Sequence, residues 1–464
     1  MSKERPFVRD QLAELVVAVR FDRLPADVVK EAKRLMLDTL ACAFGALGGE
    51  PVEAVRATAH ELGGAPQATA IGERTRTSCA LATLVNGTLF RYQDANDYYF
   101  GRDPSHASGN LAPVLAVAEH MHRSGADALA AFVAAYEVQL RLCDFAGTPS
   151  LWDRGWHHAT NMQFASAAAA ARLLGLSPAQ VANAISIAGT QNNTLTESMR
   201  GRMCSMKASI EANTGKVGVE AALLAKNGLT GPEGIFEGDF GWTRVVAGEV
   251  DYAKLTAPLG DHYKIMDTCM KPYSAHALSQ GLIEATRCLR EENAFDPDDI
   301  ESIKGFLAEP VFRQPSMDKA KLVIPENRET ADHSPSYLMA VALLEKACGP
   351  EQFRPELLQS PQVRKLIGQI TLGPDPRLDS LYPASMGGGI EVRLRDGRRL
   401  EKFVIHPPGH PRNRLSDQEV EMKFIRYAAQ SSLDAGDIDA LIESVWNFDR
   451  IDDVGRFMAV LQGA

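Results

Sequence analysis

The sequence predicts a mainly α-helical protein that carries a smaller α+β domain. Apolar residues recur at intervals of three and four over most of the first 260 residues, which is the period of an amphipathic helix. Between about residues 299 and 406, apolar and polar residues alternate instead, which is the period of a strand. A chain of 464 residues that is 45% hydrophobic can bury a large core and is long enough for two or three domains.

The first helical pattern runs over residues 28–47, and the preceding Pro25-Ala26-Asp27 suits a helix start. Similar patterns follow at 79–92, 110–125, 126–145, 161–176, 177–191 and 213–228. The Ala-rich stretch 165–171 would let helix axes approach closely, which favours a compact helical bundle.

The pattern changes after about residue 265. Alternation predicts strands within 299–309, 367–373 and 388–406, and Asp396-Gly397 predicts a tight turn inside the last of them. Helices are expected at 276–292, 336–347 and 415–430, and we expect the C-terminal tail to pack on the first domain. The sequence therefore predicts a large helical domain of residues 1–265 and 406–464, with an α+β domain of residues 266–405 between them.

Charge and hydropathy exclude several function classes. The formal net charge of -10 argues against non-specific binding to nucleic acid or to an anionic membrane. No apolar run reaches the roughly 18 residues of a membrane span, and the N-terminus lacks the apolar core of a signal peptide. We expect a cytoplasmic protein.

The sequence indicates no cofactor. The seven cysteines are scattered without CxxC or ferredoxin-type spacing, so we expect reduced, buried thiols, although a metal site built from distant cysteines stays open. No GxGxxG or Walker pattern opens a helix after a strand, so no nucleotide cofactor is indicated.

One connection is unusually rich in ionisable and aromatic side chains. The segment "DANDYYFGRDPSHASGN" (94–110), which contains Asp94 and His106, lies between two apolar helical stretches. A surface loop is normally polar without needing both aromatic and histidine side chains, so this segment is a candidate to line a pocket.

Three further segments carry candidate groups, and each also has a plain structural interpretation. His157 and His158 in "RGWHHATN" precede an Ala-rich helix, where they would meet an anion or cap the helix. A stretch at 198–209 between two helices is either a ligand site or a solvated basic turn, and its cations are Arg200, Arg202 and Lys207. Lys271 and His276 lie at the predicted domain junction, where pockets are common.

In order and spacing, these segments resemble the MmgE/PrpD family, which includes 2-methylcitrate dehydratase, cis-aconitate decarboxylase and an iminodisuccinate epimerase. The resemblance spans nearly the whole chain and includes "LDTLACAFGAL", "NGTLFRYQDAND", "GWHHAT", "MKPYSAH", "ADHSPSYLMAVALLE" and "PPGHPRNRLSDQEVEMKF". It implies a helical domain formed by N- and C-terminal segments, an inserted α+β lid, a site between the two, and a homodimer.

The resemblance also implies a set of site residues. Those assigned to catalysis are Asp94, His106 and His157. Those assigned to binding the substrate's carboxylates are Lys207, Lys271 and His276. Arg200 and Arg202 are weaker candidates that come from the basic stretch at 198–209 and not from the resemblance. His106 is the first choice for general base or acid, because a neutral histidine exchanges protons near pH 7. No metal ligand is predicted.

The activity that follows is a cofactor-independent lyase, most simply one that dehydrates 2-methylcitrate or a citrate-like acid. Such a reaction needs a base, an acid for the departing hydroxyl, and cations for the carboxylates. The expected partner is a small carboxylic acid, with no nucleic acid or membrane.

Three alternatives remain open: decarboxylation of cis-aconitate, epimerisation or isomerisation of a dicarboxylate, and carboxylate binding without catalysis. The chain departs from the family pattern at Tyr98, where many members have Thr, and at Ala107, where Pro is common. Segment 309–315 lacks the Tyr of the decarboxylase branch, whereas the long 97–106 loop and segment 330–341 look more like the dehydratase branch.

Overall fold

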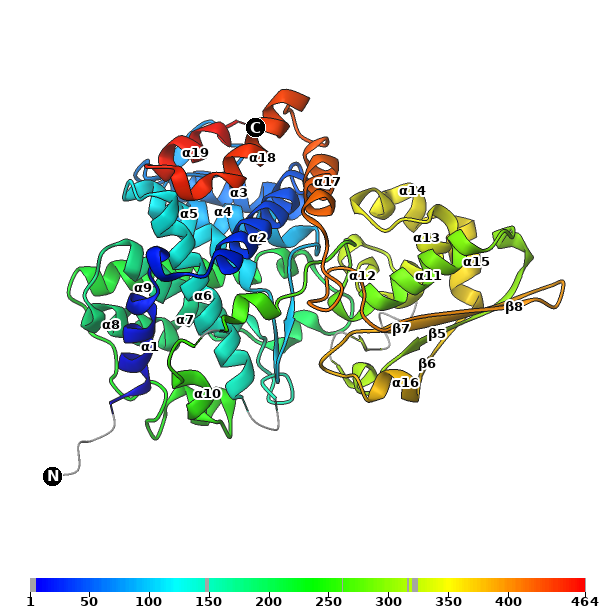
Figure 1. Cartoon of the computed structure of the whole chain (residues 1–464), viewed down its shortest axis with the longest axis horizontal. Coiled ribbons are helices and arrows are strands. Elements are labelled where there is room, and N and C mark those ends of the chain that lie inside the picture. The colour runs from blue at the N-terminus through cyan, green and yellow to red at the C-terminus, as the bar shows by residue number, and fades with distance from the viewer. Residues whose placement is uncertain (1–5, 147–149, 261, 315–316, 319–323, 464) are drawn as a thin grey trace.

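The computed structural model describes residues 6–146, 150–260, 262–314, 317–318 and 324–463. A large helical domain forms one end of the molecule and a smaller α+β domain forms the other (Figure 1). The first and the last described residues of the chain both belong to the helical domain. This is the mainly α architecture with a smaller α+β part that the sequence predicts.

Helices from the first half of the chain build most of the helical domain. They are α1 Val8–Ala18, α2 Ala26–Phe44, α3 Glu50–Leu62, α4 Cys79–Tyr92, α5 Leu111–His120, α6 Gly125–Phe145, α7 Ala159–Leu173, α8 Pro178–Gln191, α9 Ile210–Lys226 and α10 Tyr252–Thr256. Helix α7 is almost wholly buried, and it packs against α6, α8 and α9. A Cβ at Gly218 of α9 would lie 2.5 Å from Cβ of Ser166 in α7, so the close approach of these helices requires small residues.

Two short hairpins interrupt these helices. The strands β1 Ala68–Thr69 and β2 Arg76–Thr77 pair antiparallel, as do β3 Tyr99–Phe100 and β4 Pro104–Ser105. The second hairpin lies inside the polar 94–110 segment, immediately before His106.

A four-stranded sheet organises the α+β domain. Its strands are β5 Ile300–Leu307, β6 Ile370–Pro374, β7 Gly388–Leu394 and β8 Arg399–Val404, in the order β6-β5-β7-β8. β5 pairs in parallel with β6, through Ile303 opposite Ile370, and antiparallel with β7. The turn between β7 and β8 is the predicted Asp396-Gly397, with Gly397 at φ +91°.

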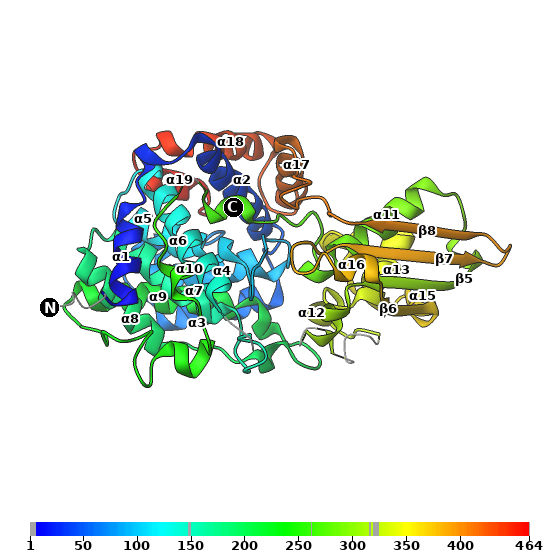
Figure 2. The ribbon, with the colours of Figure 1, turned by 60° about the horizontal axis from the view of Figure 1, so that its bottom comes forward.

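Helices pack on this sheet, which reaches away from the helical domain (Figure 2). The helices of this domain are α11 Gln280–Glu292, α12 Arg328–Ala331, α13 Pro335–Glu345, α14 Pro355–Leu358, α15 Pro361–Gln369 and α16 Pro376–Asp379. α11 contacts β7 and β8, α13 contacts β6, and α15 contacts β5.

The C-terminal tail returns to the helical domain as α17 Asp417–Ala428, α18 Ala435–Trp446 and α19 Val454–Val460. α17 packs on α2, where the rings of Phe44 and Phe424 meet edge to face at 5.5 Å. Two separate apolar cores result. One joins buried residues of 8–270 to those of 415–461, and the other lies within 269–394 together with Tyr98.

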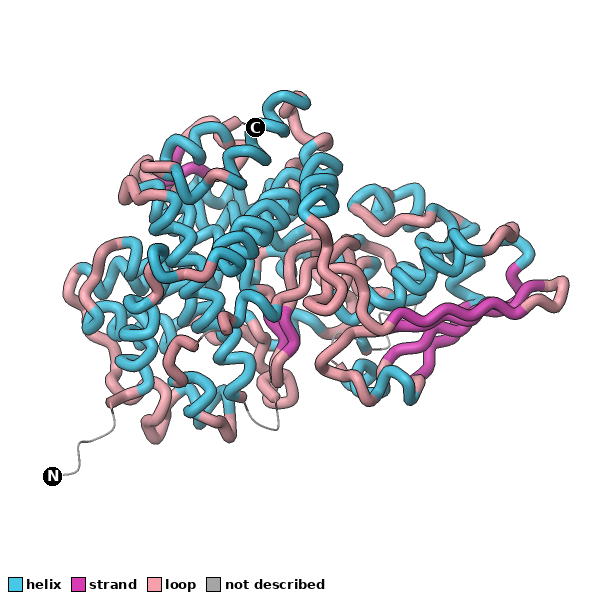
Figure 3. The backbone as a smooth tube through the Cα atoms, in the orientation of Figure 1, coloured by secondary structure: helices cyan, strands magenta, loops and turns pink. Residues whose placement is uncertain are grey.

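The segments that link the two cores are mainly loops (Figure 3). The chain passes from one core to the other at about residue 270 and back at about residue 409. These two crossing segments touch where the Met270 N–H donates to the Gly409 carbonyl at 3.0 Å. A Cβ at Gly409, which has φ +86°, would lie 1.9 Å from the Met270 carbonyl oxygen, so this approach requires glycine. Within the described part of the chain, no helix has the length and hydropathy needed to cross a membrane.

Candidate active site

A small cavity lies where the two domains meet, and imidazole rings dominate its polar wall. The helical domain supplies Arg91, His106 and His158, and the α+β domain supplies His276 and His333. The opposing apolar wall includes Tyr98, Phe100, Trp152 and Met199. The cavity has a volume of about 20 Å³, enough for roughly one water molecule.

Asp94 is the centre of a buried ion cluster behind the cavity. Its carboxylate lies 2.7 Å from Arg91, 2.9 Å from Lys207 and 2.5 Å from Lys271, and the residue is 1% exposed. Burial alone would raise the pKa of Asp94, but the three neighbouring cations hold that pKa well below its usual range. Asp94 therefore stays ionised near pH 7, which suits a shared counter-ion better than a proton carrier.

The two lysines brace this cluster from opposite domains. Lys271 binds both the carboxylate and the backbone carbonyl of Asp94, the latter at 3.0 Å. Lys207 bridges from Asp94 to Asp332 of the α+β domain, at 2.7 Å. Neither lysine is among the described residues that line the cavity. Both therefore contact the cavity only through the residues of its wall.

His106 has a defined tautomer. Its Nδ1–H donates to the Asp97 carbonyl at 2.5 Å, which leaves the lone pair on Nε2. Nε2 lies 3.4 Å from a guanidinium nitrogen of Arg91. Burial, and then the nearby charges of Arg91 and Lys271, lower the pKa of His106 well below its usual value. The ring is therefore neutral near pH 7 and can accept a proton.

The structure separates the roles of the two consecutive histidines. His158 lines the cavity 5.3 Å from the His106 ring and donates from Nε2 to Glu211 at 3.1 Å. His157, the residue expected to act, lies behind it with its ring centre 4.0 Å away, and its Nδ1 accepts from the Ala159 N–H. Burial lowers the pKa of His158 to about 3.

His276 and His333 form the wall of the α+β domain, with stacked rings 4.4 Å apart. His333 donates from Nδ1 to Asp332 at 2.5 Å. Burial lowers the pKa of His276 well below its usual value and raises that of Asp332 to about 6. Together with the helical domain, they place four buried histidines around one cavity.

Four of these residues are not among the candidates that the sequence gives: Arg91, Glu211, Asp332 and His333. His158 is among them, but the resemblance assigns catalysis to its neighbour His157. Arg91 closes α4, where it pairs with Asp94 and, at 3.0 Å, with Glu211. The available signal for Asp332 and His333 was their place directly before the helix cap Ser334, in a segment noted only for its resemblance.

The structure does not bring Arg200 and Arg202 to the cavity. Both are exposed, and Arg202 pairs with Glu326 at 3.0 Å on the surface. Gly201 between them has φ +62°, and the turn leaves both side chains facing solvent while the nearby Met199 reaches the cavity. The expectation that these arginines bind substrate has no support in this arrangement.

Among the residues that the structure describes, two groups of side chains have the geometry to hold a metal ion: His106, His158 and Glu211, and Asp94, Asp332 and His333. Their ligand atoms lie within 4.8 Å of one another. Each carboxylate, however, already pairs with a cation, Glu211 with Arg91 and Asp332 with Lys207. A divalent ion would have to compete with these buried pairs.

Metal removal is therefore expected to leave turnover unchanged. Protein treated with EDTA and desalted should keep its kcat, because the cations that would stabilise an anionic intermediate are side chains. Loss of activity that a divalent metal restores would contradict this expectation.

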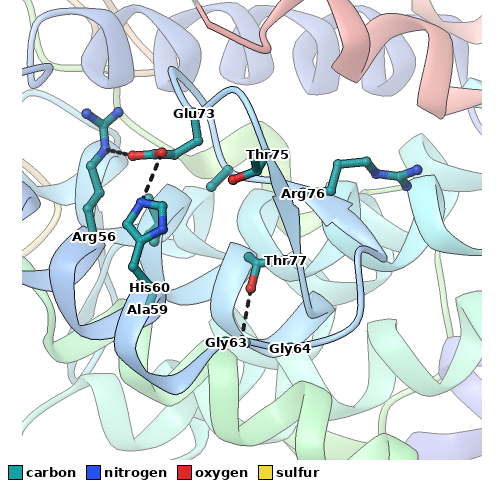
Figure 4. Close-up of a pocket in the computed structure, with 11 residues that line it drawn as sticks. Arg56, Ala59, His60, Gly63, Gly64, Glu73, Thr75, Arg76 and Thr77 are labelled. Carbon is teal, nitrogen blue, oxygen red and sulfur yellow. Dashed lines mark hydrogen bonds and ion pairs between the residues drawn. The ribbon is translucent and has the colours of Figure 1, made fainter.

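A second pocket, of about 170 Å³, lies between α3 and the β1–β2 hairpin (Figure 4). Arg56 and His60 both point to Glu73, at 3.3 and 3.1 Å. These polar groups contact one another, and the imidazole of His60 is exposed, so the pocket lacks the buried imidazoles of the other cavity. The histidine cavity is the stronger candidate for an active site.

Comparison with known proteins places the whole arrangement in one family. The MmgE/PrpD N-terminal domain matches residues 10–254 and the MmgE/PrpD C-terminal domain matches residues 273–448. The cis-aconitate decarboxylase-like protein oryM of Aspergillus oryzae is 28% identical, over 98% of this chain and 97% of its own. Cis-aconitate decarboxylase of Homo sapiens is 27% identical over 98% and 95%, and 2-methylcitrate dehydratase of Cupriavidus necator is 27% identical over 89% and 88%.

Proposed function

Because this chain belongs to the MmgE/PrpD family, we propose that it is a lyase of small carboxylic acids that removes water from 2-methylcitrate or a similar acid. The observation that carries the proposal is the cavity between the domains, where four buried histidines surround Arg91. The reaction uses side chains alone.

We assign the first proton transfer to His106. A substrate carboxylate bound by Arg91 would lie beside the unprotonated Nε2 of His106, which is 3.4 Å from the guanidinium. His106 takes the proton from the carbon next to that carboxylate, and Arg91 stabilises the negative charge that develops. The carbon–oxygen bond then breaks, the double bond forms, and the hydroxyl leaves as water after receiving a proton.

The charge balance of the site suggests the source of that second proton. Three cations face three carboxylates: Arg91, Lys207 and Lys271, and Asp94, Asp332 and Glu211. The fixed charges therefore cancel, and a bound polyanion raises the pKa of the histidines around it. His158 or His276, protonated in this way, supplies the acid.

The small cavity volume implies that the domains separate to admit the acid. Room for about one water molecule is too little for a citrate-sized molecule, and the polar wall comes from both domains. Closure around the substrate would exclude water and bring the histidines of the two domains together.

Decarboxylation is the second candidate, because relatives named cis-aconitate decarboxylase match 98% of this chain. The same groups would hold a carboxylate while carbon dioxide leaves and a histidine protonates the carbanion. The absence of a Tyr in segment 309–315 favours dehydration.

Incubation with 2-methylcitrate, citrate, cis-aconitate and iminodisuccinate, followed by NMR, tests the proposal. Dehydration yields an alkene that keeps every carbon, whereas decarboxylation releases carbon dioxide and epimerisation yields a diastereomer. We expect an alkene from 2-methylcitrate. Thermal stabilisation by these acids without any turnover would contradict a lyase and indicate a binding protein.

The pH dependence of kcat/KM should report the low pKa of His106. A base must be neutral to act, so the rate falls as pH drops through the pKa of His106 in the free enzyme. Because that pKa lies well below 6.5, we expect the acidic limb to have its midpoint below pH 6.5. A midpoint at or above pH 6.5 would contradict a buried, neutral His106.

A further inference from the structure

A buried lysine of the C-terminal segment contacts backbone carbonyls next to Asp94 and at Lys271, the two residues that form a buried ion pair. Lys423, in α17, donates to the Asp38 carboxylate at 2.6 Å, to the Ala95 carbonyl at 2.7 Å and to the Lys271 carbonyl at 2.8 Å. An ammonium group has three hydrogens, so these three acceptors use all of them. The acceptors belong to α2, to the 94–110 segment and to the segment near residue 270 where the chain first passes between the domains.

The two carbonyls belong to the loops that present the ion cluster. Ala95 directly follows Asp94, which has φ +47°. This is a left-handed backbone conformation that residues other than glycine rarely adopt. Such a backbone persists only where its surroundings hold it. The Tyr98 N–H joins the same two loops by donating to the Cys269 carbonyl at 2.9 Å.

We propose that Lys423 is a positioning residue of the active site, which fixes the loops that carry Asp94 and Lys271 and so makes α17 part of the catalytic apparatus. The catalytic consequence rests on the proposed function, whereas the effect on the loops does not. Lys423 does not line the cavity. It acts through the backbone of the loops that carry Asp94 and Lys271, the ion pair behind the cavity.

The charge of Lys423 is constant over the range in which activity is measured. Burial alone would lower its pKa, but the adjacent Asp38 carboxylate raises that pKa above its usual value. Lys423 is therefore an ammonium group that holds its acceptors and takes no part in proton transfer.

The chain offers a matched control in Lys33 of α2. Lys33 also joins α2 to the C-terminal segment, through the Asp449 carboxylate and the Trp446 carbonyl. Within the described residues, its hydrogen bonds do not reach the loops at 94–97 or 269–272. Lys423→Met and Lys33→Met each remove one largely buried ammonium, but only the first releases the site loops.

Hydrogen exchange and turnover, measured on both variants, test the proposal. In Lys423→Met, peptides that cover residues 93–99 and 269–273 should exchange faster than in the wild type, whereas in Lys33→Met they should not. Both variants should lose melting temperature, but kcat should fall by about a hundredfold only in Lys423→Met, because small displacements of a site cost that much. Unchanged exchange in these peptides, or a kcat equal to that of Lys33→Met, would overturn the proposal.

Two further results would still decide the role of Lys423, even if the single variant does not fold or the wild type shows no activity. If Lys423→Met does not fold, the double variant Asp38→Asn, Lys423→Met leaves no unpaired buried charge and should show the same loosened loops. If the wild type turns over none of the four acids, the proposed function fails, while the exchange comparison still decides the role of Lys423.

Discussion

Replacing His106 with glutamine is expected to lower kcat by about a hundredfold to ten-thousandfold while the protein stays folded. His106 presents a basic Nε2 next to Arg91, and glutamine offers no basic nitrogen in its place. Steady-state kinetics and a thermal melt on the same sample measure both effects. His157→Gln is the matched control, because His157 is equally buried but lies behind His158, and it should lose far less activity.

A structural role for His106 predicts the opposite pattern. Its Nδ1–H donates to the Asp97 carbonyl. If that were its only role, the replacement would lower the melting temperature and leave the folded fraction active. A folded His106→Gln protein with near-native kcat would remove His106 from the mechanism.

Replacing Asp94 with asparagine is expected to destabilise the protein by about 3–5 kcal/mol, because three buried cations lose their shared counter-ion. Urea unfolding of the variant and the wild type measures the difference. Asp22→Asn is the control, since Asp22 pairs with Arg20 on the surface and its loss should change little.

The same variant separates two roles for Asp94. A counter-ion predicts lower stability together with slower turnover. The acidic limb should move to lower pH, because the Asp94 carboxylate raises the pKa of His106. If the free energy of unfolding stays at its wild-type value while kcat collapses, Asp94 is a proton carrier and the counter-ion role is wrong.

Periodicity in the sequence was enough to predict the architecture. Helical spacing at 79–92 corresponds to α4, and the alternation around Asp396-Gly397 corresponds to the β7–β8 hairpin. These patterns predict well because each reflects one buried face, which local sequence records directly.

The segments of the candidate site could be predicted from the sequence, but only some of its side chains could. Asp94, Lys207 and Lys271 come from distant segments and meet in one cluster, in line with the family resemblance. Which of His157 and His158 faces the cavity depends on the rotation of the chain as it enters α7, and no pattern in the sequence records that rotation. Likewise, the turn at Gly201 decides that Arg200 and Arg202 face solvent.

The central claim is that substrate binds among the histidines between the two domains. A crystal structure of the EDTA-treated protein with 2-methylcitrate, solved with the His106→Gln variant to prevent turnover, tests it most directly. We expect density for the acid with a carboxylate on Arg91 and with His158, His276 and His333 around it. An acid bound in the pocket of Arg56 and His60, with the histidine cavity closed and empty, would contradict it.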